Sequence, residues 1–142
     1  GANLASADLR KAQLFMTNLR GANLTGANLA HANLAGARLV DATVSGANFK
    51  GTNLRSINMQ ELDLQGIDFR GAVLVGTNFS NANLSNTDLR DAWLYHAKLK
   101  ETNLNGADLS TSKIWYHQIK NAVSCNTKSR FWGVINTACV GM

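Results

Sequence analysis

A residue pattern with a period of five runs through most of this chain. Among the 23 positions whose numbers end in 4 or 9, from Leu4 to Ile114, 17 are leucine and the others are Phe, Val, Met or Ile. The positions two residues earlier hold 14 alanines and five threonines, and the positions between hold 11 asparagines and five aspartates. The repeating unit is therefore Ala-(Asn/Asp)-Leu-x-x.

A period of five fits neither regular secondary structure. In an unbroken α-helix the leucines would wind around the axis, and in an unbroken strand they would alternate between the two faces. A bend once per repeat resolves this, because Ala and Leu then point inward from a short extended segment and Asn or Asp points outward. Ten of the twelve glycines occur in the repeats at numbers ending in 1 or 6, where a tight corner needs a small residue. Proline is absent, as expected if the extended segments must donate their backbone N–H groups.

Strings such as GANLTGANLAHANLAGARL (21–39) and NANLSNTDLRDAWL (81–94) resemble the pentapeptide-repeat family. The resemblance covers residues 1–115 and implies an all-β fold, a right-handed quadrilateral β-helix with four repeats in each coil. Residues twenty apart then stack, so we expect Phe49 to lie against Phe69. We also expect Ile57, Leu62 and Ile67, which replace alanine in three successive repeats, either to bulge the wall or to shift the neighbouring inward residues.

The same twenty-residue period assigns the outward residues to four faces of the solenoid. On one face two columns carry opposite charges, namely Arg10, Lys50, Arg70 and Arg90 beside Asp8, Asp68, Asp88 and Asp108. This arrangement predicts a ladder of solvated ion pairs. The next face carries a candidate interaction patch, which consists of Val73, Val75, Trp93, Tyr95 and Trp115. Two alternatives stay open for it: a free partner or dimer surface, or a satellite core covered by the C-terminal segment.

The repeat pattern ends after residue 115, and we expect residues 116–142 to form a C-terminal cap, because an open last coil would expose its interior and its strand edges. In YHQIKNAVS (116–124), Ile119 and Val123 are four apart, which predicts a short helix with its apolar side inward. Two cysteines, Cys125 and Cys139, are 14 apart and can bond only where the chain doubles back, with Gly133 as a candidate turning point. From the residues alone they are either a disulfide or two free buried thiols.

The end of the chain resembles that of exported pentapeptide-repeat proteins of photosynthetic bacteria and plastids. Those proteins end with a Cys-Asn-Thr segment, a glycine about midway and a second cysteine near the terminus. The similarity rests here on Cys125, Asn126, Thr127, Gly133, Asn136 and Cys139. The usual Met-Pro-Asp before the glycine is replaced by Arg-Phe-Trp (130–132). The resemblance implies a disulfide between Cys125 and Cys139 that closes a hairpin, and a periplasmic or thylakoid-lumen location. Without the bond we expect a cytoplasmic location.

No pattern of catalytic, cofactor-binding or metal-ligating residues emerges, so we expect a chain that is not an enzyme and needs no cofactor or metal. Two histidines, His96 and His117, are 21 residues apart and could approach each other near the end of the rod, but no third ligand is identifiable. No apolar run reaches the roughly 20 residues of a membrane span, and the first residues lack a basic-then-apolar export signal.

Three classes of function compete. We favour a structural or interaction scaffold with an unknown protein partner. A DNA-mimicking gyrase binder, known in the resembled family, should be strongly negative, whereas this chain carries a net charge of +5. The C-terminal residues 95–142 carry +4 of that charge, which keeps nucleic-acid binding as a less favoured alternative. Because Gly1 already lies in repeat phase, we also expect the first coil either to support an end-to-end homodimer or to follow further residues of the native protein.

Overall fold

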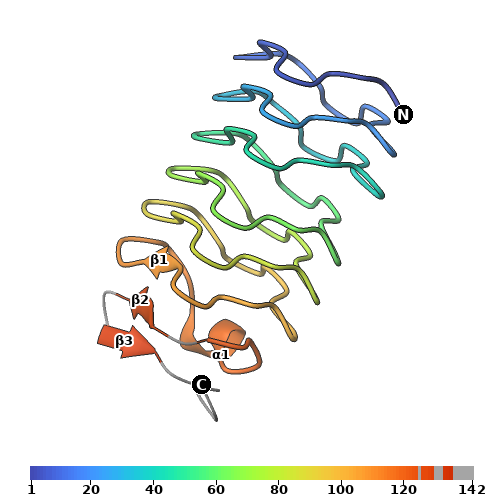
Figure 1. The fold of residues 1–142 in the computed structure, drawn as a ribbon. Helices are drawn as coiled ribbons and strands as arrows, with labels where there is room; N and C mark the ends of the chain where they lie inside the picture. Colours follow the sequence, from blue (N-terminus) through green and yellow to red (C-terminus); the bar gives the residue numbers. More distant parts are fainter. Residues whose placement is uncertain (125, 130–132, 136–142) are drawn as a thin grey trace.

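The chain winds into a stack of coils (Figure 1) in a computed structural model that describes residues 1–124, 126–129 and 133–135. Parallel bridges join residues twenty apart, from Asn3 with Asn23 to Asn103 with Val123, so four pentapeptides make one coil. Residue 1 lies at one end of the stack, and the named elements gather at the other, in the order β1 (Asp108–Leu109), α1 (Tyr116–Ile119), β2 (Thr127–Ser129) and β3 (Gly133–Ile135). The predicted all-β solenoid is confirmed. Within the part of the chain that the structure describes, no helix is long and apolar enough to cross a membrane.

The Leu positions of the repeat fill the axis of the stack. Leu64 and Phe49 have no exposed surface, and the Ala positions pack beside them. Phe49 and Phe69 stack with ring centroids 5.4 Å apart, as the twenty-residue return predicts, and Phe79 meets Phe69 edge-on at 6.3 Å. Because burial of one such side chain stabilises the fold by about 1.5–3 kcal/mol, the packed axis is the main source of stability.

Each corner depends on left-handed backbone rather than on small size alone. Gly51 has φ of 64°, but His31 and Asp91 occupy equivalent corners with φ of 61°. Glycine is common here because it adopts positive φ without strain, and other residues at the same corners incur a cost of about 1–2 kcal/mol. Small size is required only at particular corners. At Gly51, for example, a Cβ atom would lie 2.5 Å from Nδ1 of His31.

The outward Asn or Asp of each repeat shapes the turn that follows it. Its side-chain oxygen accepts a hydrogen bond from the backbone N–H two residues later, as Arg55 donates to Asn53 at 3.3 Å and Arg90 to Asp88 at 3.2 Å. Amides also link successive coils, since Nδ2 of Asn53 donates to Oδ1 of Asn33 at 3.1 Å. The preference for Asn and Asp at this position therefore reflects turn chemistry.

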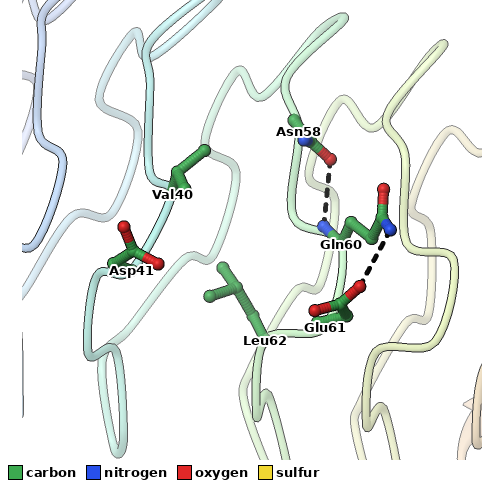
Figure 2. Close-up of a pocket in the computed structure, with 6 residues that line it drawn as sticks. All are labelled: Val40, Asp41, Asn58, Gln60, Glu61 and Leu62. Carbon is green, nitrogen blue, oxygen red and sulfur yellow. Dashed lines mark hydrogen bonds between the residues drawn. The ribbon is translucent and has the colours of Figure 1, made fainter.

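The ladder of backbone hydrogen bonds between successive coils opens at one seam, which lies between the third and fourth coils. Among residues 1–115, Thr43 and Asp63 are the one outward pair twenty apart that forms no bridge. Leu62 stands in a column where the coil before it has Ala42, and its side chain points into the space between the two coils (Figure 2). Leu62 is only half-buried, whereas Ile57 in the third coil is buried. At Leu62 the wall opens, which is one of the two outcomes expected for these substitutions. Ile57 and Ile67 are buried, and the outward residues Asn58 and Asp68 beside them keep their bridges.

The last described residues keep the five-residue phase, which corrects the predicted helix. Helix α1 is only four residues long, and Ile119 is fully buried, but Val123 is 39% exposed instead of facing inward. Val123 takes the outward position of a further repeat, because Ala122 and Ser124 on either side are buried. Its N–H donates to the carbonyl of Thr102 at 2.9 Å, so it continues the ladder.

Strands β1, β2 and β3 form a small sheet at this end. β2 pairs in parallel with β1, again at a spacing of twenty, and β3 pairs antiparallel with β2. Gly133 is the first residue of β3 and has φ of 64°. Cys125 and Cys139 lie outside the described residues.

Candidate interaction surface

The aromatic patch, defined as Val73, Val75, Trp93, Tyr95 and Trp115, lies on two adjacent outward columns of three successive coils. Bridges from Val73 to Trp93 and from Trp93 to Lys113 fix one column. The backbone of the other is held by ladder bonds such as Gly76 N–H to Tyr95 C=O at 3.0 Å. The positions of Val73 and Trp93 hold Asn in many other repeats, so in this column the patch is a local replacement of polar residues on a continuous ladder.

The two tryptophans of the patch are substantially exposed. Trp93 keeps 43% and Trp115 keeps 44% of its surface in solvent, whereas Val73, Val75 and Tyr95 are half-buried. The Nζ of Lys113 lies 3.9 Å from the centre of the Trp93 ring, in a cation–π contact. The surface is therefore apolar with a cation at its edge.

A ring cluster joins the aromatic patch to helix α1. Trp115 contacts Tyr95 at 5.1 Å between ring centroids, His96 edge-on at 5.0 Å and His117 in a stack at 5.6 Å. The expected approach of His96 and His117 is confirmed, because both contact the same indole. They line a pocket of about 400 Å³ together with Lys98 and Lys100.

Gln118 fixes helix α1 to the last coil. Its Nε2 is buried and donates to the carbonyls of Leu94 at 2.7 Å and Ala97 at 2.9 Å, while its Oε1 accepts the N–H of Trp115 at 3.0 Å. These bonds set the position of His117, next to Gln118 in the helix, beside the indole of Trp115. Sequence reasoning missed this role of Gln118, and a lone polar residue beside Ile119 gives little signal for it.

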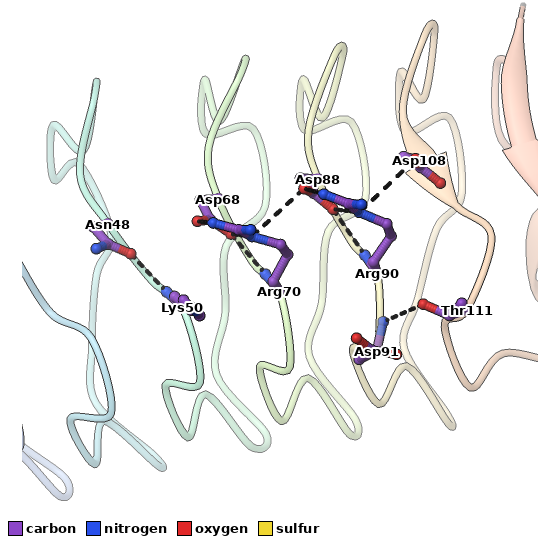
Figure 3. Close-up of polar contacts among 9 residues, drawn as sticks. All are labelled: Asn48, Lys50, Asp68, Arg70, Asp88, Arg90, Asp91, Asp108 and Thr111. Carbon is purple, nitrogen blue, oxygen red and sulfur yellow. Dashed lines mark hydrogen bonds and ion pairs between the residues drawn. The ribbon is translucent and has the colours of Figure 1, made fainter.

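The charged face forms the predicted ladder (Figure 3). Arg70 pairs with Asp68 at 2.7 Å and lies 3.6 Å from Asp88, and Arg90 pairs with Asp88 at 2.6 Å. The hydrogen bonds from the Arg70 side chain lower the pKa of Asp68, and those from Arg90 lower the pKa of Asp88, while desolvation opposes both shifts. Arg10, Arg70 and Arg90 each pair with a carboxylate, whereas Lys50 has no ion pair in the described part of the chain. Because the four cations of this face stand beside four carboxylates, it holds no surplus charge with which to attract a phosphate.

The seam beside Leu62 opens into a second surface pocket. It has a volume of about 420 Å³ and is lined by Val40, Asp41, Asn58, Gln60, Glu61 and Leu62 (Figure 2). Asp41 is paired with Arg20 at 3.3 Å, and Glu61 accepts a hydrogen bond from Gln60 at 3.0 Å. No nucleophile paired with a base lines it. Among the described residues, no group of three or more His, Cys, Asp or Glu is arranged to hold a metal ion.

Comparison with known proteins agrees with the architecture. The family model for pentapeptide repeats, in eight copies, matches residues 17–55, 52–91 and 88–122. No curated protein sequence matches the chain. A crystal structure of a pentapeptide repeat protein from the thylakoid lumen of Arabidopsis thaliana is 26% identical, with a TM-score of 0.66, and the match covers 71% of this chain and 70% of that one.

A second similar structure is a variant of QnrB1, a plasmid-mediated fluoroquinolone resistance protein. It is 22% identical, with a TM-score of 0.76, and the match covers 91% of this chain and 65% of that one. At this identity the likeness shows the fold alone. Because the family model covers residues 17–122 with the same repeat that forms the coils, the chain belongs to the pentapeptide repeat family.

Proposed function

We propose that this chain is a non-catalytic scaffold, a right-handed four-sided solenoid that binds a protein partner through the aromatic patch. The observation that carries the proposal is that Trp93 and Trp115 are both about half exposed. They lie on a face whose backbone is held by hydrogen bonds between successive coils. Tryptophan and tyrosine are the residues most often found at the energetic centres of protein interfaces. Exposing them costs solvation free energy, which burial by a partner would recover.

Rigidity of the underlying backbone also supports the proposal. The N–H of Trp93 donates to the carbonyl of Ala72 at 2.9 Å, and its carbonyl accepts the N–H of Leu74 at 2.9 Å. Because both partners lie in the neighbouring coil, the column that contains Trp93 moves with the stack. Lys113 and the rings around Trp115 further restrict the side chains. A surface ordered before binding loses less conformational entropy when a partner docks.

The test is affinity capture with matched variants. The double variant Trp93→Ser/Trp115→Ser removes the two tryptophans of the patch. The control Phe15→Ser removes a more exposed aromatic from the column of Trp115, five coils away. We expect the same captured proteins with wild type and Phe15→Ser, and their loss with the double variant. Equal capture by all three proteins would contradict the proposal.

DNA mimicry and nucleic-acid binding have weaker support. A mimic of duplex DNA needs a run of unpaired negative charge, but the acidic column here is neutralised by Arg70 and Arg90. The net charge of +5 has the wrong sign. Basic residues of the C-terminal third would suit a nucleic acid, and competition by a single-stranded DNA tests that alternative.

We further propose that the chain is of the exported type, with a disulfide between Cys125 and Cys139 and a periplasmic or thylakoid-lumen location. The thylakoid-lumen relative and the antiparallel return of β3 along β2 support this reading. The bond would close a loop of about 15 residues and stabilise by about 3 kcal/mol in the chain-entropy model. Intact mass after alkylation without reduction tests it: two alkylated thiols in oxidised material would contradict the bond and the location.

Two further proposals concern the organisation of the chain. We propose repeats over residues 1–115 and a closing cap over 116–142, with the fixed position of Gln118 as support. We also propose end-to-end association through the first coil, where Leu4 and Leu9 are only half-buried. Light scattering over a range of concentrations tests the second, since a monomer at every concentration would contradict it.

A further inference from the structure

The charges of the outer surface are separated by face. The aromatic face has the outward columns that contain Trp93 and Trp115, and the adjoining basic face has the columns that contain Lys98 and Lys100. From residue 13 to residue 115, neither pair of columns nor the corner between them contains an Asp or Glu. All charged side chains on the two faces are cations, namely Arg20, Arg38, Arg55, Lys98, Lys100 and Lys113. The carboxylates lie on the opposite faces and at the outer corners.

Cations surround the aromatic patch most closely near helix α1. Lys113 lies over Trp93 on one side. Lys98 and Lys100 line the pocket on the other side, beyond the corner at His96. Of these three lysines only Lys100 has an ion pair within the described part of the chain, a 3.6 Å contact with Glu101 between two largely exposed side chains. Such a pair is worth less than about 1 kcal/mol and yields readily to a partner.

We infer that the partner of the aromatic patch is an acidic protein segment that crosses the corner at His96, with apolar side chains on the patch and carboxylates at Lys98, Lys100 and Lys113. The inference rests on the proposed function and adds the chemistry of the partner. Charge complementarity selects the occupant: a basic segment would be repelled by both faces, and a neutral one would leave the lysines unused.

The ring contacts favour a protein segment over a single-stranded nucleic acid. Base stacking needs open aromatic faces. His117 stacks on Trp115 with an angle of 29° between the rings, and Lys113 covers a face of Trp93. What these tryptophans offer is therefore edges and partial faces, which suit the aliphatic and aromatic side chains of a peptide.

The test is selection of a random peptide library on the immobilised protein, followed by affinity measurement with four variants. Lys98→Glu/Lys100→Glu reverses the charge beside the patch, and Lys11→Glu/Lys50→Glu makes the same change in net charge on other surfaces. We expect selected peptides to combine Asp or Glu with apolar residues. They should bind the Lys11/Lys50 variant like wild type and the Lys98/Lys100 variant about tenfold more weakly, with the difference shrinking at high salt.

The remaining two variants separate this inference from the proposed function. If peptide affinity falls in Trp93→Ser/Trp115→Ser but the peptides lack acidic enrichment and ignore Lys98→Glu/Lys100→Glu, the inference is overturned and the scaffold proposal stands. If no selected peptide discriminates Trp93→Ser/Trp115→Ser from Phe15→Ser, both are contradicted. A single-stranded 20-mer DNA that displaces the peptides and binds more tightly, through the same lysines, would replace the acidic protein segment with a nucleic acid.

Discussion

Replacing Leu62 by alanine tests whether this side chain holds the third and fourth coils apart. The seam lacks ladder bonds that the other coils have, such as Val44 N–H to Asp63 C=O and Asp63 N–H to Ala42 C=O. If Leu62 is the wedge, the alanine variant lets the coils close to the spacing of their neighbours. Each backbone bond regained contributes about 0.5–1.5 kcal/mol.

The loss of buried surface opposes that gain. Leu62 is only half-buried, so truncation to alanine removes about 1–1.5 kcal/mol of hydrophobic stabilisation. The two effects nearly cancel, and we expect the free energy of unfolding of Leu62→Ala to lie within about 1 kcal/mol of wild type. Leu64→Ala, two residues away and fully buried, should lose about 2–5 kcal/mol.

Urea denaturation followed by circular dichroism gives both free energies, and amide hydrogen exchange reports the seam directly. In Leu62→Ala the amides of Val44 and Asp63 should become protected, as ladder amides elsewhere are. A Leu62→Ala variant that loses as much stability as Leu64→Ala, with unchanged exchange at Val44 and Asp63, would refute the wedge.

Three further predictions follow from the core and the charged face. Leu64→Asp should abolish the cooperative unfolding transition in circular dichroism, because it places an unpaired carboxylate in the dry axis; a folded variant would disprove the inward register. Thr77→Val should cost about 1–3 kcal/mol in urea denaturation, because the buried Oγ1 of Thr77 donates to the carbonyl of Leu54 at 2.8 Å, and an unchanged stability would contradict that role. The lowered pKa values of Asp68 and Asp88 give stability that is present above the ordinary carboxylate pKa near 4 and lost as pH falls through the folded pKa. Melting temperatures between pH 6 and pH 2 should therefore fall less in Asp68→Asn/Asp88→Asn than in wild type, and parallel curves would count against the ion-paired ladder.

The sequence pattern predicts the architecture because one physical constraint recurs in every repeat. Each inward Leu must return to the axis after five residues, so a single bend per repeat explains the entire run, and the Phe49–Phe69 stack follows from the same spacing. The backbone conformation required at the corners is harder to predict from the sequence. Glycine suggested a need for small size, whereas His31 at φ of 61° shows that the requirement is left-handed backbone.

The region after residue 115 was harder to predict because its inward residues change type. Serine replaces leucine at Ser124 and Ser129, so the hydrophobic signal vanishes while the backbone keeps its phase. Ala122 and Thr127 lie at numbers ending in 2 and 7, like the Ala and Thr of earlier repeats, and that remaining signal identifies Val123 as outward. The prediction of a short helix with both Ile119 and Val123 facing inward gives too much weight to the spacing of two apolar residues.

The candidate site was partly predictable for the same reason as the fold. Twenty-residue stacking places Trp93 and Trp115 on one face from the sequence alone. The contacts of Lys113, His96 and His117 with these rings depend on side-chain conformations and on how α1 is held, which periodicity does not determine.

The most direct measurement of the central claim is site-specific photo-crosslinking from the aromatic patch. A benzophenone amino acid in place of Tyr95 lies within the patch, and the same group in place of Phe15 lies in the same outward column far from it. We predict that irradiation with the host's protein extract links a defined protein to position 95 and not to position 15, and that Trp93→Ser removes the adduct. No adduct at position 95, or the same adducts at both positions, would contradict the assignment of this surface as a protein-binding site.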